Sequence, residues 1–581
     1  MTRAKVFWSL AVLAIFGCGL SAQGQDWLWA VRLGGAGTDQ GNSLAVDPSG
    51  SVFIAGEFEG AWTYGYNYLN SAGGRDILIA RAYANGNPHW AKRAGSTDDD
   101  SAEAIVLDAE GNIYVTGSFR GSVAFGSTTL TSAGYSDVFV AKLSGAGTWL
   151  WAVQAGGADN DIGRGVSVDA SGNVYVTGEF SGTAAFGSNS LTSSGSTDIF
   201  IAKLNSSGAW LWPRKLGSSG ADYGMALCAD AAGNSYVTGY FTGTVSVGTV
   251  AVLISAGEVD AFVLKISSAG NWVWARRGGG TLSDRSYGIA LDADGYCCIT
   301  GNFRGSAVFG TSTLASAGND DLFIAKLSSA GAWQWAVRGG GSSNDCGYCL
   351  ATDAGGKIYA GGAFGGTAAF GSSSVASAGS SDVLIAKLDS GGDWMWAKRA
   401  GGSLGDHAYG IGLDALACVY ITGQFGETAD FGSENLTSAG VSDVYIAKLA
   451  YRIPRFPLDL QISVSGSDVL LTWDPVTHSI WNDPLTPDYY VVYRSLSDPY
   501  GEYIVAGISY GTSYTGSNAA NYARAFYKVT AYVDDGEETR SGPGLRSWLD
   551  ANFKPGMTEA EVEAAILNRC SRVVRDLRLR Q

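Results

Sequence analysis

An all-β fold built from repeated four-stranded units is predicted for this 581-residue chain. Three observations carry the prediction. The composition combines 83 Gly, 18 Trp and 28 Tyr with only 11 Pro, which is typical of many short strands joined by tight glycine turns. A Trp-x-Trp segment recurs along the chain at a nearly constant interval. Between its copies lie β-branched and aromatic runs bounded by turn residues.

The repeat has seven copies, spaced by 61 or 62 residues. Each copy contains four candidate strands, which in the third copy are "GVSVD", "NVYVTGEF", "DIFIAKL" and the Trp segment. The second and third strands are apolar on both faces, so we expect them to be buried on both sides. The second tryptophan of each segment marks the period: Trp29, Trp90, Trp151, Trp212, Trp274, Trp335 and Trp396.

The two ends of the repeat region decide between a closed ring and an open array. The seventh copy ends with "DVYIAKLA" (443–450) and is followed by "YRIPRFP" where a Trp strand is expected. An unattached Trp strand, "WLWAVRLGG" (27–35), precedes the first copy. Pairing these ends completes the seventh unit and leaves no long sheet edge unpaired. We therefore predict a seven-bladed β-propeller over residues 25–450, with the N-terminal strand closing the last blade.

The repeat pattern "DxxGNxYVTGxF…G…FGxxxLxSxGxxDxFIAKL" resembles that of the bacterial seven-bladed β-propeller repeat (SBBP) family. The resemblance implies the propeller architecture and an extracytoplasmic location, and it implies no common ligand.

Two further segments come after the repeats. Residues 455–545 resemble a fibronectin type III module, with Trp473, Tyr493 and Tyr527 at that family's core positions, and the strand patterning favours the same β-sandwich. Residues 546–581 are predicted to form a short helical tail, because acids fill its first turn and arginines its last.

The N-terminus predicts export. Basic Arg3 and Lys5 precede an eleven-residue apolar run and small residues, so residues 1–24 are interpreted as a signal peptide. The run is too short to span a bilayer, which needs about 20 residues, and no later stretch is a candidate transmembrane segment. We expect a secreted or cell-envelope protein; attachment through a lipid on Cys18 stays open as an alternative. The net charge of -16 argues against nucleic acid as a partner.

Aspartates recur in three columns of the repeat. The first precedes the small-residue strand, the second opens the "DxxGN" turn, and the third precedes "xFIAKL". On one face of a ring, the first column could bind cations such as calcium, but the favoured interpretation is structural, because turn aspartates commonly accept backbone N–H bonds. No metal or other cofactor is predicted. The first column is Asp39, Asp100, Asp161, Asp222, Asp284, Asp345 and Asp406.

The first repeat departs from its siblings in one loop. Trp62, Tyr66 and Tyr68 stand where the second repeat has Val, Ser and Thr. Aromatic side chains in a loop predict a stacking surface for an extracellular glycan or an anchor for an envelope protein. The alternative is that they pack on a neighbouring loop or module.

A catalytic constellation is not visible in the sequence. Only His407 of the three histidines lies beside a recurring aspartate, and a nucleophile or metal around it is not evident. We therefore predict a binding or adhesion protein and not an enzyme. Two alternatives stay open: a structural envelope scaffold, and a polysaccharide-cleaving enzyme whose carboxylates would come from Glu57, Glu59 and Glu179.

Overall fold

The computed structural model describes residues 26–450 and six short strands between residues 461 and 532. The predicted signal peptide (1–24) and helical tail (546–581) lie outside the described residues. Within the described part the chain is all-β, without an α-helix, so it also holds no helix long and apolar enough to cross a membrane. The chain divides into two compact units, Trp27–Ala450 and a second composed of Met1–Asp26 with Tyr451–Gln581.

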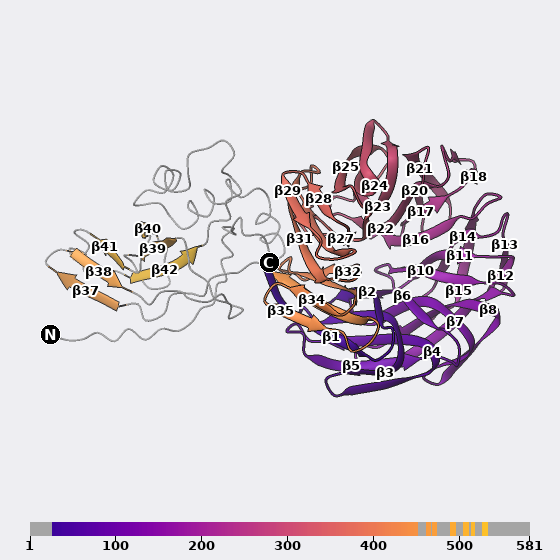
Figure 1. The fold of residues 1–581 in the computed structure, drawn as a ribbon, viewed down its shortest axis with the longest axis horizontal. Coiled ribbons are helices and arrows are strands. Elements are labelled where there is room, and N and C mark those ends of the chain that lie inside the picture. The colour runs from indigo at the N-terminus through magenta and orange to yellow at the C-terminus, as the bar shows by residue number, and fades with distance from the viewer. Residues whose placement is uncertain are drawn as a thin grey trace. The chain divides into compact units, whose positions relative to one another are not determined.

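The unit Trp27–Ala450 contains seven groups of four antiparallel strands (Figure 1). The first two groups are β2 (Gln40–Val46), β3 (Val52–Tyr64), β4 (Asn67–Ala82), β5 (Pro88–Ala94), and β6 (Ser101–Leu107), β7 (Ile113–Phe125), β8 (Thr128–Leu143), β9 (Trp149–Gly157). The third and fourth are β10 (Asp161–Val168), β11 (Val174–Phe180), β14 (Asp198–Leu204), β15 (Trp210–Leu216), and β16 (Tyr223–Ala229), β17 (Ser235–Phe241), β20 (Asp260–Ile266), β21 (Trp272–Gly280). The fifth and sixth are β22 (Asp284–Leu291), β23 (Cys297–Phe309), β24 (Ser312–Leu327), β25 (Trp333–Gly341), and β26 (Asp345–Thr352), β27 (Ile358–Phe364), β30 (Asp382–Leu388), β31 (Trp394–Gly402). The seventh is β32 (His407–Leu413), β33 (Val419–Phe425), β36 (Asp443–Ala450) and β1 (Asp26–Gly35).

A hairpin between the second and third strand of each group reaches the preceding group. In groups one, two and five it is the continuation of the long strands β3–β4, β7–β8 and β23–β24. In several groups this hairpin pairs with the outer strand of the group before, as β12 does with β9 and β23 with β21. The separate hairpins are β12 (Thr183–Phe186) with β13 (Asn189–Thr192), β18 (Thr244–Val247) with β19 (Ala251–Ile254), β28 (Thr367–Phe370) with β29 (Ser373–Ala376), and β34 (Thr428–Phe431) with β35 (Glu434–Thr437).

The N-terminal strand β1 makes the contacts that an outer strand makes in other groups. It lies between β36 and β3 in one continuous sheet. Trp27 meets Phe431 edge to face, with ring centroids 5.2 Å apart, as Trp149 meets Phe125 in the second group. Trp29 lies 6.1 Å from Tyr420, and the equivalent pair in the second group has the same separation. β1 therefore supplies to the last group the two aromatic contacts that its own sequence lacks.

The innermost strands of the seven groups contact one another in sequence order. Each of β2, β6, β10, β16, β22, β26 and β32 contacts the next, and β32 contacts β2. Figure 1 shows the groups following one another around a common centre. The second and third strands carry the core, since side chains on both of their faces are buried, as in β11 and β14.

The second unit is described only by its strands. They form two three-stranded antiparallel sheets, of order β37-β38-β41 and β40-β39-β42. Most of the segment 455–545 lies outside the described residues, and the fibronectin type III-like fold stays a prediction. The strands are β37 (Gln461–Ser465), β38 (Asp468–Thr472), β39 (Tyr489–Ser495), β40 (Ile504–Ser509), β41 (Ser513–Gly516) and β42 (Phe526–Tyr532).

Removal of β1 should destabilise the unit. Trp27→Ala is expected to lower the free energy of unfolding by about 3–5 kcal/mol, because it deletes a buried indole, and deletion of 27–35 should cost more. Leu150→Ala is the control, since that outer-strand side chain is 51% exposed. Chemical denaturation of the three variants checks this; unchanged transitions for Trp27→Ala and for the deletion would contradict the role of β1.

Candidate functional site

The first aspartate column joins neighbouring repeats. Asp100 is 1% exposed; its Oδ2 accepts the Ser96 N–H at 2.6 Å and its Oδ1 the Arg120 N–H at 2.8 Å. All seven members accept the same two backbone N–H groups, four residues before and twenty residues after the aspartate. The donors lie at or just beyond the end of the outer strand of one repeat, and within or just beyond the second strand of the next. The column thus fastens consecutive repeats and does not form an exposed acidic ring.

The third column lies against the first. Asp443 is fully buried, and its Oδ2 accepts the Ala439 N–H at 2.7 Å and an Arg32 N–H at 2.9 Å, whereas its Oδ1 has no partner. The same oxygen is unpartnered in all seven members of the third column: Asp76, Asp137, Asp198, Asp260, Asp321, Asp382 and Asp443.

A glycine separates the two carboxyl groups at each junction. A Cβ atom on Gly34 would lie 2.3 Å from Asp443 Oδ1 and 2.7 Å from Asp39 Oδ2, so only glycine fits there. Burial raises the pKa of Asp39 to about 7, with the nearby Asp443 charge adding to the shift. Below that pH, Asp39 carries a proton that can face the unpartnered oxygen. The described residues contain no group of three or more His, Cys, Asp or Glu side chains suited to a metal ion.

The second column closes turns. Asp108 Oδ1 accepts the Glu110 and Asn112 N–H groups at 3.1 and 2.7 Å, and Oδ2 accepts the Tyr114 hydroxyl at 3.1 Å. Gly111 in the same turn has φ 78°, a left-handed conformation that favours glycine. This column therefore has a local structural role.

The three predicted stacking residues do not share one surface. Tyr66 and Tyr68 are exposed, at 103% and 62%, on the β3–β4 hairpin. Trp62 is 0% exposed and lies near Phe58 and Tyr64, with ring centroids 6.2 and 6.3 Å away. The predicted surface is therefore wrong in including Trp62, and only the two tyrosines remain available to a ligand.

Trp62 occupies a position that is buried in every repeat: its equivalents, all 0% exposed, are Val123, Ala184, Val245, Ala307, Ala368 and Ala429. The first repeat has Pro88 where the other outer strands begin with Trp, as at Trp149. In the second repeat Trp149 packs on Phe125; in the first, Tyr64 takes the Phe position and its hydroxyl donates to the Gly86 carbonyl. The first repeat thus has an indole at position 62 of the hairpin and a proline in place of the outer-strand tryptophan.

The residues that differ between repeats gather at one end of the inner strands. They occupy three positions in each repeat. The first is the residue directly after the first-column aspartate, and the second is the third residue after that aspartate. The third position faces the first one on the neighbouring strand. We call these side chains the variable surface. In repeat order they are Gln40, Asn42, Glu57; Ser101, Glu103, Ser118; Ile162, Arg164, Glu179; Tyr223, Met225, Tyr240; Arg285, Tyr287, Asn302; Cys346, Tyr348, Ala363; and His407, Tyr409, Gln424.

Repeats one to three contribute a charged sector. Arg164 bridges Glu179 at 2.8 Å and Glu103 at 3.1 Å. Arg75, beside this sector, pairs with Glu57 and with Asp99. Burial raises the pKa of Glu57 and of Glu179 in spite of these arginines. Both buried glutamates are thus committed to ion pairs within the protein.

Repeats four to seven contribute an aromatic sector. Its rings contact one another in series: Tyr223 to Tyr240 at 4.8 Å, Tyr240 to Tyr287 at 6.2 Å, Tyr287 to Tyr348 at 5.6 Å, and Tyr348 to Tyr409 at 5.2 Å. All five tyrosines are half-buried. Burial raises the pKa of Tyr240 to about 12, so its hydroxyl stays a protonated hydrogen-bonding group.

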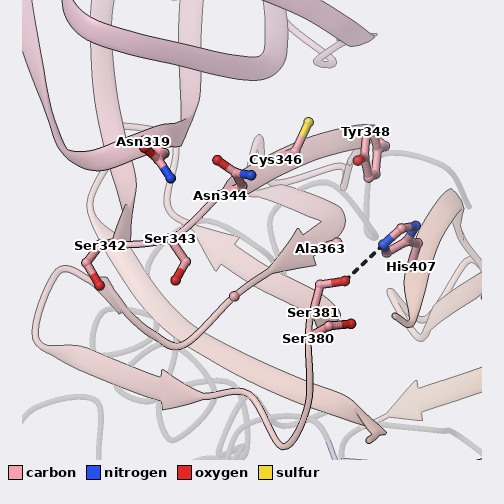
Figure 2. Close-up of a pocket in the computed structure, with 11 residues that line it drawn as sticks. Asn319, Ser342, Ser343, Asn344, Cys346, Tyr348, Ala363, Ser380, Ser381 and His407 are labelled. Carbon is pink, nitrogen blue, oxygen red and sulfur yellow. Dashed lines mark hydrogen bonds between the residues drawn. The ribbon is translucent and has the colours of Figure 1, made fainter. Parts of the chain in front are cut away.

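A cavity of about 470 Å³ opens beside the aromatic sector (Figure 2). Figure 2 shows Ser342, Ser343 and Asn319 on one side and His407 on the other. The lining side chains carry hydroxyl, amide, imidazole and thiol groups and no carboxylate, ammonium or guanidinium. They are Asn319, Ser342, Ser343, Asn344, Cys346, Tyr348, Ala363, Gly365, Ser380, Ser381 and His407.

A short hydrogen-bonded series crosses the cavity wall. His407 Nε2 lies 3.1 Å from Ser381 Oγ, and His407 Nδ1 lies 2.6 Å from the Tyr409 hydroxyl. Burial lowers the pKa of His407, so the ring is neutral at pH 7. Asp406 does not orient it, because that carboxylate accepts the Gly402 and Gly426 N–H groups. The series can donate and accept hydrogen bonds to a ligand, and among the described residues no carboxylate hydrogen-bonds the histidine.

The cysteine pair and the other two histidines are the remaining sequence candidates. Cys346 and Cys349 are both free, although they form a CxxC pair, and Cys349 is buried. His89 packs on Tyr83 at 4.6 Å, and His478 lies outside the described residues.

The aromatic sector is the feature that the sequence prediction missed, because that prediction compared the repeats only in their loops. A signal for it exists in the sequence. Three successive repeats carry a tyrosine at the same position, three residues after the first-column aspartate. These are Tyr287, Tyr348 and Tyr409.

Sequence comparisons agree with the fold. The family model described as a beta-propeller repeat (SBBP) matches residues 28–57 and 150–179. An uncharacterized WD repeat-containing protein of Acanthamoeba polyphaga mimivirus, L264, is 23% identical over 533 residues, covering 73% of this chain and 38% of that protein. The regulatory protein FlaEY of Caulobacter vibrioides is 27% identical over 339 residues, covering 54% and 34%. The chain therefore matches little more than a third of the length of these relatives.

A solved structure described as YCF48 bound to D1 peptide covers 74% of this chain and 97% of its own, at 11% identity and a TM-score of 0.36. The repeat match and the strand order make this chain a β-propeller protein. It carries at least two repeats of the SBBP type.

Replacing Trp62 should lower the stability of the protein much more than replacing an exposed tyrosine. Trp62→Ala is expected to lower the free energy of unfolding by about 3–5 kcal/mol, because it empties a buried site. Tyr66→Ala should change it by less than about 0.5 kcal/mol, since that side chain touches solvent. Urea denaturation checks both values, and equal effects would contradict the assigned burial.

The pair of buried carboxyl groups at each junction predicts that stability depends on pH. Replacing one carboxyl group of a pair by an amide should reduce that dependence. The folded-state pKa of Asp39, about 7, lies above its ordinary value of 3.8. Its contribution to stability is therefore complete below about pH 4 and is lost as the pH rises through 7. In Asp443→Asn the amide can donate to Asp39, so the melting temperature of the variant should gain on wild type between pH 4 and 8. Parallel pH profiles would contradict this.

Asp39→Asn is the matched control for that experiment. Both carboxylate oxygens of Asp39 accept backbone N–H groups, so an amide nitrogen there would face a donor. A loss of about 1–3 kcal/mol is expected at every pH.

Proposed function

We propose that this chain is an extracytoplasmic binding protein without enzymatic activity, which holds its ligand on a closed seven-bladed β-propeller. The four-stranded groups would be the blades, with β1 completing the seventh. The predicted signal peptide (1–24) would direct export to the periplasm or the cell surface. The fibronectin type III-like segment (455–545) would serve as a spacer.

One observation carries the proposal: the repeated side chains are structural, and four of the side chains that vary line a cavity, namely Cys346, Tyr348, Ala363 and His407. The recurring aspartates and tryptophans are used in contacts between strands and between repeats. The side chains that differ from repeat to repeat gather on the variable surface instead. The backbone scaffold is the same in each repeat, whereas the side chains at one end of the inner strands differ. Such an arrangement suits recognition of an asymmetric ligand. An extracellular glycan or an envelope protein is the expected partner.

The enzymatic alternative has less support. Glu57 and Glu179 would have to leave their arginine partners to act as a carboxylate pair, and Glu59 is on the exposed edge of β3. The Ser381–His407 contact favours hydrolysis only if the serine becomes nucleophilic, which usually needs an orienting acid beyond the histidine.

A glycan array incubated with the full-length protein, with and without calcium, tests the proposal. Tyr348→Ala should reduce glycan capture by about tenfold or more, because stacking residues dominate binding energy. Tyr135→Ala is the matched control, since that tyrosine is 61% exposed and remote from the cavity lining. Calcium removal should have no effect, as the aspartates of the first and third columns are buried and those of the second column hold their own turns.

Other outcomes would overturn it. Release of new reducing ends from a bound polysaccharide, lost in His407→Ala, would establish the enzyme instead. A second contrary result would be that no glycan is captured and that Tyr348→Ala pulls down the same envelope proteins as wild type. That result would favour a structural envelope scaffold.

A further inference from the structure

We propose that the aromatic sector and its cavity bind an acidic polysaccharide, and that Arg285 receives a carboxylate of its sugar units. This inference rests on the proposed binding function and specifies its ligand class and site.

Arg285 differs from the other arginines near the variable surface. Arg75 and Arg164 are each held by two acidic side chains. In the described part of the chain, no carboxylate lies within ion-pair distance of Arg285, which is half-buried in the aromatic sector. Its guanidinium instead lies over the Tyr240 ring, 5.6 Å from the centroid. Stacking orients the plane of the guanidinium and leaves its edge N–H groups for a planar anion.

The rings beside Arg285 provide the second element of recognition. Tyr287 lies two residues further along the same strand and contacts Tyr348 in the next repeat. Aromatic faces in a binding site take up apolar ligand surfaces, and a sugar ring presents such a surface through its C–H groups. Tyr348 also lines the cavity, so the aromatic sector leads from Arg285 to the cavity without a break.

The cavity provides the third element. Asn344, Ser343 and Ser381 offer amide and hydroxyl groups that both donate and accept hydrogen bonds, as sugar hydroxyls require. The lining contains no charged side chain, so the charge of the proposed site comes from Arg285 beside it. The site therefore offers one position for an anion and several for neutral hydroxyls, which is the chemistry of a uronic-acid-containing chain. An acidic peptide would share the anion but would leave the hydroxyl-rich wall without partners.

The ligand has to span more than one repeat. Arg285 is on β22 and is not part of the cavity lining, whereas Cys346 and His407 of the lining are on β26 and β32. Packed sheets are about 10 Å apart, so a ligand that reaches both is an oligosaccharide and not a single sugar.

Calorimetry on the full-length protein tests this. The probes are tetramers of galacturonic and of mannuronic acid, their carboxyl-reduced forms, and the monomeric acids. At least one acidic tetramer should bind about tenfold or more tighter than its reduced form and its monomer, with the preference weakened by salt. Arg285→Gln should remove the preference while leaving binding of the reduced tetramer unchanged.

Arg276→Gln is the matched control, because Arg276 also lies over an aromatic ring, Trp274 at 5.9 Å, but on the outer strand β21. It should bind like wild type. Melting temperatures of both variants would show that neither substitution unfolds the protein.

Three results would overturn the inference. Equal affinity for acidic and reduced tetramers, unchanged in Arg285→Gln, would mean a neutral glycan and would leave the proposed function intact. Binding of tetraglutamate, dependent on Arg285, without binding of either uronate would mean an acidic peptide. No binding of any of these probes would exclude the site as an acidic-glycan site, and the Tyr348→Ala capture assay would then decide separately whether the protein binds through this surface.

Discussion

The structure depends on one contact that occurs at every junction: a buried aspartate that accepts two backbone N–H groups from different repeats. Burying a carboxylate is costly unless hydrogen bonds compensate it, and two N–H donors supply that compensation. Asp39 connects β1 with the start of the first repeat in the same way that Asp100 connects the first repeat with the second. The contact also places the variable surface, because the residue directly after each aspartate is the first member of that surface.

That adjacency explains how one scaffold carries different chemistry in each repeat. The aspartate holds the end of every inner strand in the same place, so the neighbouring side chain can change without moving the backbone. Arg164 and Glu179 form an ion pair there, whereas Tyr287 and Tyr348 form a ring contact. The variable surface therefore has a charged and an aromatic part, although the repeats that build them share one strand arrangement.

Much of the strand pattern and the role of the aspartates could be predicted from the sequence, because both are repeated and repetition is visible within a single chain. The unattached strand at 27–35 was also recognisable from its Trp-x-Trp motif, and it pairs with β36. Trp62 was misplaced because the prediction treated it as a loop residue, whereas it is on β3 at a position that is buried in every repeat. The tyrosines of the aromatic sector recur visibly in the sequence, but their contacts could not be predicted from it, because the rings meet only when separate inner strands lie side by side.

The position of β1 has a consequence for biogenesis. Arg32 on β1 and Asp443 on β36, which form an ion pair, are separated by 411 residues. The first strand of the unit must therefore wait for almost its last part before it finds its partner. Contacts of such sequence separation form slowly, and until then both β1 and β36 are open edges that invite pairing with other chains. A chaperone that shields these edges would act on the growing polypeptide, and a chain that terminates early would never bury them, which would mark it for proteolysis.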